Sequence, residues 1–371
     1  MTRPASVADS STVDAGVVLP RSRFALFDAY PELGTSLARI ELGSFPSPLE
    51  HASHLHEDVW IKRDDDFTRS PSCDSSFELA RLFGGGKVRK LELFFGDARA
   101  KGKRRVVTSG GVGSNQALAV AVLGPALGFS ARVHLAPQPK SSLTTANLSA
   151  DAATNAEMRL FDTVTNAHAR ALREAQESED TYVIPPGGTT PLGTLGFVSA
   201  GLELAEDVRA GRMPSPRRVY VALGLGGTAA GLGLGCALGG LSTEIVAVRT
   251  STPTTVTMAT LRAIYDETIA FARAHAPSFS APSFTKANIR IDGRFVGGGY
   301  GVPTAAGEDA IARARASEGW ELDPVYTGKA LAALLSDVRD GERGPHLFWN
   351  TMSSRPVARA KVPEAFARFA S

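Results

Sequence analysis

Short apolar runs alternate with longer segments of helical periodicity along most of this chain. The runs have the length and apolar content of buried strands, and they lie at 59–62, 106–108, 132–135, 182–184, 219–223, 245–249 and 346–349. Between them, apolar residues recur every three or four positions, which predicts helices at 87–101, 115–127, 167–177, 194–210, 304–317 and 329–338. Strands that alternate with such helices predict an α/β fold, in which helices cover both faces of parallel sheets.

Composition narrows the classes of protein that this chain can represent. Its 371 residues are 43% hydrophobic and 21% charged, which is typical of a globular protein and long enough for about two domains. The formal net charge of +2 argues against a nucleic-acid partner, and no run approaches the ~20 apolar residues of a membrane span. Residues 1–20 form a predicted loose lead-in without the apolar region of a secretory signal. The two cysteines, Cys73 and Cys236, fit a reducing compartment, so we expect a cytoplasmic location.

Glycine-rich loops join a strand to a helix at three places, 109–115, 186–193 and 224–231. In α/β sheets such junctions bind anions, because the free N–H groups of the helix N-terminus face the ligand. The third loop also fits the dinucleotide pattern G-x-G-x-x-A, but the acidic residue Glu244 precedes the next strand instead of ending it. We therefore expect the phosphate of a smaller cofactor at this loop, although glycines also permit tight packing of a helix on a sheet.

Lys87 follows three consecutive glycines and opens a predicted helix. The positive end of a helix disfavours the charged form of a lysine, as a Schiff-base lysine requires. Lys90, one turn further on, is placed to meet an anion at the same helix end. A basic helix start that is merely solvated is the alternative interpretation of these two lysines.

A series of motifs in a fixed order gives these features a common meaning. It comprises Lys62-Arg63-Asp64-Asp65, Gly84-Gly85-Gly86-Lys87, Ser109-Gly110-Gly111-Val112-Gly113-Ser114-Asn115-Gln116, Gly187-Gly188, Gly193-Thr194-Leu195-Gly196, the 224–228 loop, Tyr300-Gly301-Val302-Pro303 and Leu322-Asp323-Pro324-Val325-Tyr326-Thr327-Gly328-Lys329. From about residue 35 to about residue 350, the chain resembles the pyridoxal-phosphate family of D-cysteine desulfhydrases and 1-aminocyclopropane-1-carboxylate deaminases.

The resemblance implies a fold type II architecture of two open, twisted, mostly parallel sheets with helices on both faces. A large cofactor-binding domain would comprise residues 1–90 plus 196–371, and a small inserted α/β domain would comprise residues 91–195. It also implies pyridoxal 5'-phosphate as cofactor, a small amino acid as substrate, a homodimer, and no metal, nucleic-acid or membrane partner.

By resemblance, each motif supplies part of an active site. Lys87 would carry the cofactor as a Schiff base, and Lys90 would hold its phosphate together with Gly224, Leu225, Gly226, Gly227 and Thr228. Asn115 would bind the phenolic oxygen of the cofactor, and the substrate carboxylate would lie against Ser114, Asn115 and Gln116. The catalytic groups would be Lys87, Ser114, Tyr300 and Tyr326, with both tyrosines beside the reacting carbon.

The partner of the cofactor's ring nitrogen falls, by resemblance, at Thr327. Relatives that open the cyclopropane ring have glutamate at this position, whereas those that desulfurate D-cysteine have threonine. A hydroxyl leaves the ring a weaker electron sink than a carboxylate does, which suits simple elimination. The resemblance thus favours α,β-elimination on a D-amino acid, with D-cysteine giving pyruvate, ammonia and sulfide. Alternatives are 1-aminocyclopropane-1-carboxylate deamination, β-replacement on the same cofactor, and a catalytically silent accessory protein.

Several positions depart from the pattern of the family. Gly86 stands where asparagine is usual, and Gly113 stands where glutamine is usual. Met352-Ser353 replaces a Gly-Gly pair, Gln116 matches the deaminases, and 68–83 reads as an insertion. Loss of two side chains near the active lysine predicts open space there, and with it a substrate bulkier than cysteine.

Other clusters of polar residues favour simpler interpretations. His51, His54 and His56 have the spacing of metal ligands, but a polar loop is favoured because no matching ligand group is evident elsewhere. The acidic run 64–66 reads as a solvated turn, and the basic run 101–105 reads as a solvated connection. Ser114 lacks the G-x-S-x-G elbow of a serine hydrolase.

Overall fold

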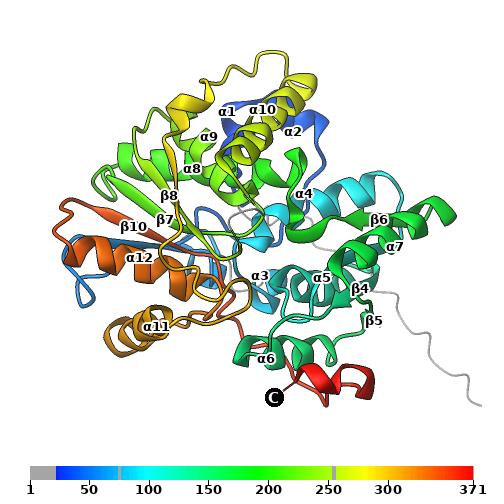
Figure 1. Cartoon of the computed structure of the whole chain (residues 1–371). Coiled ribbons are helices and arrows are strands. Elements are labelled where there is room, and N and C mark those ends of the chain that lie inside the picture. Colours follow the sequence, from blue (N-terminus) through cyan, green and yellow to red (C-terminus); the bar gives the residue numbers. More distant parts are fainter. Residues whose placement is uncertain (1–21, 74–76, 253–255, 371) are drawn as a thin grey trace, which may run out of the picture.

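The computed structural model describes residues 22–73, 77–252 and 256–370, so the predicted lead-in at 1–20 and part of the 68–83 insertion lie outside the described residues. The described chain forms two sheets (Figure 1). The larger, six-stranded sheet has the order β1 (Leu49–His51), β2 (Val59–Arg63), β10 (His346–Asn350), β7 (Arg218–Leu223), β8 (Glu244–Arg249) and β9 (Ile289–Asp292). Only the short edge strand β1 is antiparallel to its neighbour.

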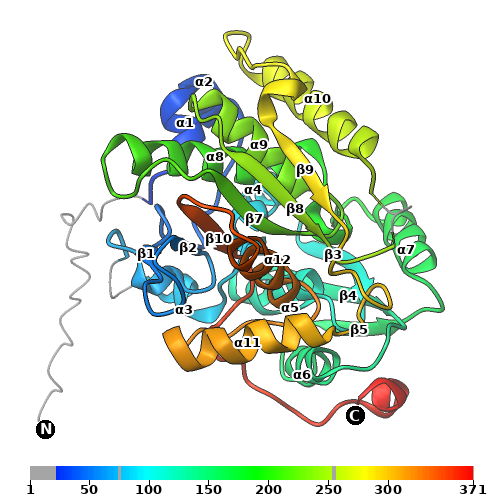
Figure 2. The same ribbon diagram turned by 60° about the vertical axis from the view of Figure 1, so that its left-hand side comes forward.

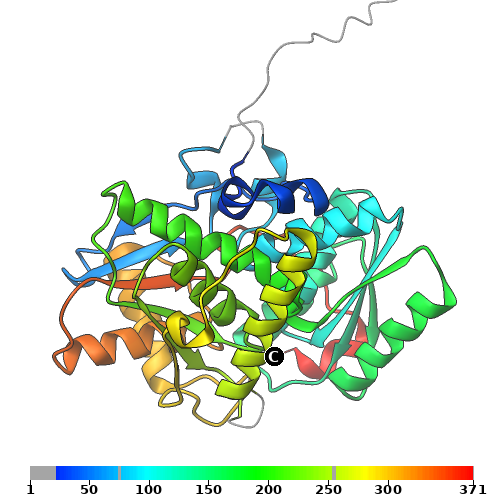
Figure 3. The same ribbon diagram turned by 90° about the horizontal axis from the view of Figure 1, so that it is seen from above.

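The smaller sheet has four strands, and all of them are parallel. Its order is β5 (Glu157–Leu160), β4 (Ser130–Ala136), β3 (Arg105–Gly111) and β6 (Thr181–Ile184). Seen from above, the two sheets lie on opposite sides of the molecule (Figure 3). The prediction of an α/β fold with two open, mostly parallel sheets is confirmed.

Helices occupy most of the segments between strands. The α-helices are α1 (Ala25–Ala29), α2 (Pro31–Ser36), α3 (Glu78–Leu82), α4 (Lys87–Ala100), α5 (Asn115–Ala126), α6 (Ser142–Asp151), α7 (Val164–Glu177), α8 (Pro191–Arg209), α9 (Gly227–Leu238), α10 (Met258–His275), α11 (Ala305–Glu318) and α12 (Thr327–Arg339). Short 3-10 turns are η1 (Phe67–Arg69), η2 (Pro186–Gly188), η3 (Phe284–Ala287) and η4 (Glu364–Phe369). No helix in the described part of the chain is both long enough and apolar enough to cross a membrane.

Alternation along the central strands explains why helices cover both faces of the larger sheet. On β7, Tyr220 faces one way, into an apolar cluster with α11 and α12, whereas Val219 and Val221 face the other, into a cluster with α8 and α9. Both sets of side chains are fully buried, as a parallel sheet requires. Figure 2 shows α11 and α12 on the opposite face of this sheet from α8 and α9.

The smaller sheet is covered by α5 and α7, and the end of the chain also reaches it. Phe366 and Phe369 of η4 join the apolar cluster formed by Val133 and Leu135 of β4 and by Leu148 of α6. Ser149 of α6 also donates its hydroxyl to the carbonyl of residue 360 at 2.7 Å. The C-terminal segment therefore packs beside α6, although the sequence assigns residues 196–371 to the large domain (Figure 1).

Candidate active site

A cavity of about 380 Å³ lies at the carboxyl ends of the central strands, where segments of both sheets meet. This is where α/β sheets bind ligands. The volume is near the lower end of the roughly 300–1,000 Å³ typical of ligand sites, which favours a small substrate. The predicted site residues that line it are Lys87, Lys90, Ser114, Asn115, Gln116, Gly224, Leu225, Gly226, Gly227, Thr228, Tyr300 and Tyr326. Thr327 is not among the lining residues.

Lys87 reaches the cavity because its helix begins on a turn held by two neighbouring strands. Gly85 donates its N–H to the carbonyl of Asp64, past the end of β2, at 2.6 Å, and Gly86 donates to the carbonyl of Thr351, past the end of β10, at 3.0 Å. Gly85 has a φ of +86°, which a residue with a side chain rarely adopts. The hydroxyl of Ser353, at one of the positions that depart from the family pattern, accepts the N–H of Gly84 at 2.9 Å.

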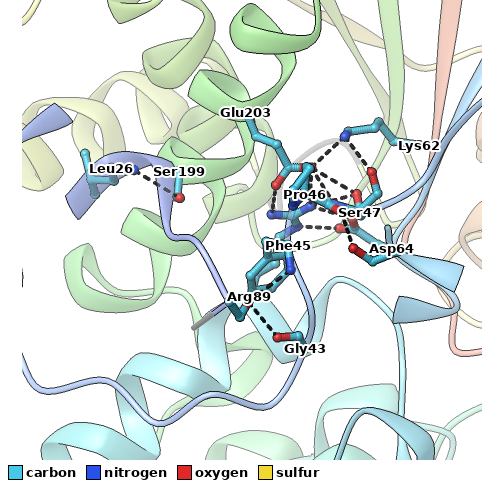
Figure 4. A network of polar contacts seen from close by, with 12 residues as sticks. Leu26, Gly43, Phe45, Pro46, Ser47, Lys62, Asp64, Arg89, Ser199 and Glu203 are labelled. Carbon is cyan, nitrogen blue, oxygen red and sulfur yellow. Dashed lines mark hydrogen bonds and ion pairs between the residues drawn. The ribbon is translucent and has the colours of Figure 1, made fainter. Parts of the chain in front are cut away.

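A buried ionic network anchors the same first turn of α4 (Figure 4). Arg89, two residues after Lys87, donates to both carboxylate oxygens of Asp64 at 2.8 Å and to Glu203 of α8 at 2.9 Å. Lys62 of β2 lies 2.6 Å from Glu203. Burial alone would raise the pKa of Glu203, but the charges of Arg89 and Lys62 outweigh it and lower the pKa to about 2. The lysine-bearing turn is thereby tied to both β2 and α8.

Lys87 and Lys90 bring two amines to one cavity without carboxylate partners among the described residues. Burial lowers the pKa of Lys87 to about 8. Burial and the neighbouring charge of Lys87 lower the pKa of Lys90 well below its usual value. The side-chain nitrogen of Lys90 donates to the carbonyl of Gly187 at 3.1 Å. Such a pair matches a ligand that combines an electrophilic carbon for one amine with an anion for the other.

An anion cradle surrounds Lys90 at the N-terminus of α9. A Cβ placed on Gly227 would lie 3.1 Å from the Thr194 hydroxyl and 3.2 Å from the Lys90 nitrogen, so only a bare backbone leaves this space for a ligand. Gly226 turns the chain into the helix with a φ of +98°. The buried Thr194 hydroxyl has no hydrogen-bond partner among the described residues. The sequence shows that Thr194 follows Gly193 near the start of α8. It does not show that the Thr194 hydroxyl lies close to α9.

The glycine-rich loop 109–115, here named the substrate loop because the family resemblance assigns the substrate carboxylate to it, runs into the start of α5. Ser114 caps this helix by accepting the N–H of Ala117 at 3.2 Å. Ser114, Asn115 and Gln116 line the cavity, so the N-terminus of the helix lies at its wall. Gln116 is 2% exposed, and both polar atoms of its amide lack partners in the part of the chain that the structure describes. A buried amide without partners, lining a cavity, is ready to bind a polar ligand.

Two phenols line the cavity together. The Tyr300 and Tyr326 hydroxyls are 2.6 Å apart. Burial raises the pKa of both, so both are neutral phenols at physiological pH. Behind Tyr326, the Thr327 hydroxyl donates to the Asp323 carboxylate at 2.8 Å. Asp323 itself lines the cavity.

Ser251 and Ser109 are lining residues that were not among the predicted site residues. The Ser251 hydroxyl is buried just beyond β8 and has no partner within residues 22–73, 77–252 and 256–370. The Ser109 hydroxyl lies 3.3 Å from Nδ1 of His168 on α7. For Ser251, the position after an apolar strand is a usable sequence signal, whereas the pairing of Ser109 with His168 depends on tertiary packing.

The expected open space at Gly86 and Gly113 is not present, and this part of the prediction is wrong. A Cβ on Gly113 would lie 2.5 Å from the side-chain nitrogen of Gln138, and a Cβ on Gly86 would lie 2.8 Å from the ring of Phe197. Gln138 comes from the segment after β4 and Phe197 from α8. Side chains from elsewhere in the chain fill both places, so these glycines do not enlarge the cavity.

The three histidines of the possible metal cluster have separate contacts. His51 lies 2.7 Å from the carbonyl of Glu57, and His56 accepts the N–H of Asp58 at 3.1 Å. His54 faces Glu318 at 3.6 Å. Across residues 22–73, 77–252 and 256–370, His, Cys, Asp and Glu side chains form no group of three arranged to hold a metal ion.

This chain belongs to the pyridoxal-phosphate-dependent enzymes: the family model described as "Pyridoxal-phosphate dependent enzyme" matches residues 40–347. Among curated relatives, the D-cysteine desulfhydrase of Salmonella schwarzengrund (strain CVM19633) is 31% identical over 336 residues, covering 85% of this chain and 94% of the relative. Nocardicin C-9' epimerase of Nocardia uniformis subsp. tsuyamanensis is 33% identical over 338 residues, covering 88% of this chain and 96% of the relative.

Solved structures agree. A crystal structure of an "ACC deaminase homologue" superimposes with a TM-score of 0.67 at 29% identity, over 87% of this chain and 93% of that one. A threonine deaminase from Solanum lycopersicum shares the fold, with a TM-score of 0.56 at 19% identity. The predicted family and its cofactor, pyridoxal phosphate, are confirmed.

The residues in the cavity fit this cofactor. A primary amine with a lowered pKa would meet the aldehyde, and the glycines at the start of α9, with a second lysine and a hydroxyl that has no partner among the described residues, would meet the phosphate. Lys87, Lys90, Thr194 and the loop 224–228 would hold the two ends of the cofactor.

Proposed function

We propose that this enzyme carries out α,β-elimination on a small amino acid, with D-cysteine as the model substrate. The products would be pyruvate, ammonia and sulfide, and one water molecule is consumed. The observation that carries the proposal is the presence of Lys87, with a pKa of about 8, in the same small cavity as two neutral, hydrogen-bonded phenols. The Lys87 amine can take a proton near neutral pH, and the pair of phenols can donate one.

Different residues of the cavity bind the substrate, remove its α-proton and protonate its leaving group. The N-terminus of α5, with Ser114 and Gln116, receives the substrate carboxylate. Bound pyridoxal phosphate supplies the electron sink that acidifies the α C–H bond. Lys87, as a neutral amine, removes the α-proton, and the Tyr300–Tyr326 pair donates a proton to the departing β-substituent. The Cβ–S bond breaks, and the released enamine hydrolyses to pyruvate and ammonia.

Relatives support both the proposal and one alternative. The desulfhydrase at 31% identity favours elimination, and the small cavity favours a small substrate. The epimerase at 33% identity favours a second candidate, inversion at Cα, which needs proton transfer at the same carbon without loss of the β-substituent. Lys87 and the tyrosine pair would then serve as the two proton-transfer groups.

Proton NMR of the holoenzyme in D₂O distinguishes these reactions in one experiment. Elimination predicts pyruvate from D-cysteine in the wild type and none from Lys87→Ala. Loss of the α-proton signal with the amino acid retained, and with its mirror image found by chiral chromatography of the same sample, supports the epimerase. 1-Aminocyclopropane-1-carboxylate in parallel tests ring opening, whose product is 2-oxobutyrate. No change in any amino acid would contradict the elimination proposal and favour β-replacement or a silent relative.

We also propose a cytoplasmic homodimer with a large domain of residues 1–90 plus 196–371, of which the C-terminal η4 packs on the small sheet, and a small domain of residues 91–195, as the family resemblance implies. Light scattering of the purified holoenzyme tests the dimer. A single monomeric species at micromolar concentration would contradict it.

A further inference from the structure

Helix α6 turns an unusual polar stripe toward the interior. Thr144, Asn147 and Asp151 recur at helical spacing, and all three are at most 5% exposed. Buried polar side chains destabilise a fold unless they are bonded, so their contacts are informative. Thr144 holds the segment before the helix, because its hydroxyl lies 3.1 Å from the carbonyl of Pro139 and 3.3 Å from Gln138.

Asn147 directly contacts the substrate loop, residues 109–115. Its side-chain nitrogen lies 2.9 Å from the backbone carbonyl of Gly113 and 2.9 Å from the side-chain oxygen of Asn115. A backbone carbonyl can only accept a hydrogen bond, so the atom facing Gly113 must be the amino end of the Asn147 amide. The same nitrogen meets Asn115, which therefore presents its oxygen to Asn147.

This arrangement fixes which end of the Asn115 amide faces the cavity. Asn115 is the first residue of α5 and lines the cavity. With its oxygen engaged by Asn147, its amino group is the end left to meet a ligand, and the described residues provide no partner for that group. An amino group donates, so the ligand atom that it meets must be an acceptor.

We propose that Asn147 is a positioning residue that holds the Asn115 amide with its donor end toward the phenolic oxygen of pyridoxal phosphate. The inference rests on the proposed role of Asn115 and deepens it. Asn147 does not line the cavity; it would act by denying Asn115 the flipped orientation, in which the Asn115 oxygen would face the phenolic oxygen of the cofactor.

The variant Asn147→Asp tests the proposal with almost no change in shape. A carboxylate can only accept, so Asn115 would turn its amino group toward Asp and its oxygen toward the cofactor. We expect the affinity of the apoprotein for pyridoxal phosphate to fall by about tenfold, the effect of one lost hydrogen bond. We also expect a shift in the absorption maximum of the bound cofactor. Ser149→Ala, on the same helix but with its hydroxyl bonded to the carbonyl of residue 360 away from the cavity, is the matched control and should leave both unchanged.

A double variant separates positioning from a general structural role. If Asn147 acts through Asn115, then Asn147→Asp should weaken binding in the wild type and have a much smaller effect in an Asn115→Ala background, where only its contact with the Gly113 carbonyl is left to disturb. Equal weakening in both backgrounds would overturn the proposal, because the residue would then act through Gly113 or the fold. Should Asn147→Asp fail to fold, Asn147→Ala in the same two backgrounds gives the same comparison.

If Asn115 does not bind the cofactor at all, the results would differ from those expected when only the proposal about Asn147 is wrong. If Asn115→Ala itself leaves affinity and spectrum unchanged, Asn115 does not bind the cofactor and Asn147 has nothing to position. If Asn115→Ala weakens binding but neither variant of Asn147 does, Asn115 keeps its role and the inference about Asn147 alone is wrong.

Discussion

The hydroxyl groups of Tyr300 and Tyr326 are hydrogen-bonded to each other at 2.6 Å. Tyr300 lies in the glycine-rich segment after β9, and Tyr326 immediately precedes α12, so the fold joins two distant segments at one point of the cavity. Because burial raises both pKa values, the pair is a proton donor and not a base at neutral pH.

Replacing Tyr326 with phenylalanine removes its hydroxyl, and with it the hydrogen bond to Tyr300, but keeps the aromatic ring in the cavity. We expect kcat to fall roughly 10²–10⁴-fold, as for loss of a general acid, while the cofactor remains bound. Steady-state kinetics and the visible spectrum of the holoenzyme check this. Tyr265→Phe, at a buried tyrosine that bonds the carbonyl of Pro282 outside the cavity, is the control and should leave kcat unchanged. Full activity of Tyr326→Phe would remove the pair from the mechanism.

The pKa of Lys87 predicts how the apoprotein takes up its cofactor. Only the neutral amine attacks the aldehyde, and burial lowers the pKa of Lys87 from 10.5 to about 8. The rate of uptake should therefore rise with pH, with a midpoint near 8, and level off above it. Stopped-flow absorbance measures this rate. Lys87→Arg, which stays charged, should form no covalent bond, and a midpoint near 10.5 in the wild type would contradict the lowered pKa.

Lys90 and Thr194 are predicted to recognise the phosphate alone. Lys90→Met and Thr194→Val should each weaken pyridoxal phosphate binding, by at least about tenfold for the loss of a bond to a charged group. Neither change should alter binding of pyridoxal, which lacks the phosphate. Titration of the apoprotein with both ligands makes the comparison. An equal loss of affinity for both ligands would show that the variants disturb the cavity as a whole.

Gln138 is predicted to exclude any larger residue from position 113. Gly113→Gln places a side chain in the volume that Gln138 fills, and such overpacking typically costs about 1–3 kcal/mol. Chemical denaturation should show this loss in the free energy of unfolding. The double variant Gly113→Gln with Gln138→Gly should recover much of it. If Gly113→Gln alone is as stable as the wild type, the space is open after all.

The ionic network behind Lys87 predicts a defined loss of stability in acid. The pKa of Glu203 is held at about 2, below its ordinary 4.5. A depressed carboxyl pKa stabilises the fold above pH 4.5, and this contribution is lost as the pH falls from 4.5 to 2. Glu203→Gln should flatten that part of the stability curve, measured by thermal unfolding of the holoenzyme. An unchanged acid slope would contradict the assignment.

Removing Arg89, the cation at the centre of this network, should lower the free energy of unfolding more than Glu203→Gln does. Arg89→Met leaves Asp64 and Glu203 buried without their main partner, which typically costs about 3–5 kcal/mol. Arg315→Met breaks an ion pair with Glu321 in which both side chains are exposed, and should lower the free energy of unfolding far less. Comparable losses in the two variants would mean that the network does not support α4.

Local patterns were sufficient to predict the parts of the site that lie within single junctions. Lys87 follows a glycine turn at a helix start, and the 224–228 loop follows an apolar strand; both signals are contiguous in sequence. The order of the motifs then identified the family, because each motif adds an independent constraint.

Residues that act across the fold could not be found in this way. Gln138 and Asn147 contact the substrate loop only because the segment after β4 folds back over it. The sequence pattern did not predict α6, because its buried face carries polar residues where a helix usually has apolar ones. The error about open space at Gly86 and Gly113 has the same origin: an absent side chain is visible in the sequence, whereas the distant side chain that replaces it is not.

The claim that Lys87 carries the cofactor is tested most directly by reducing the holoenzyme with borohydride and locating the labelled lysine by peptide mass spectrometry. Lys87 and Lys90 line the same cavity, and both have lowered pKa values, so the label reports which amine bonds the cofactor. The geometry predicts a pyridoxyl group on Lys87 and none on Lys90. Label on Lys90, or on neither, would contradict the assignment of this active site.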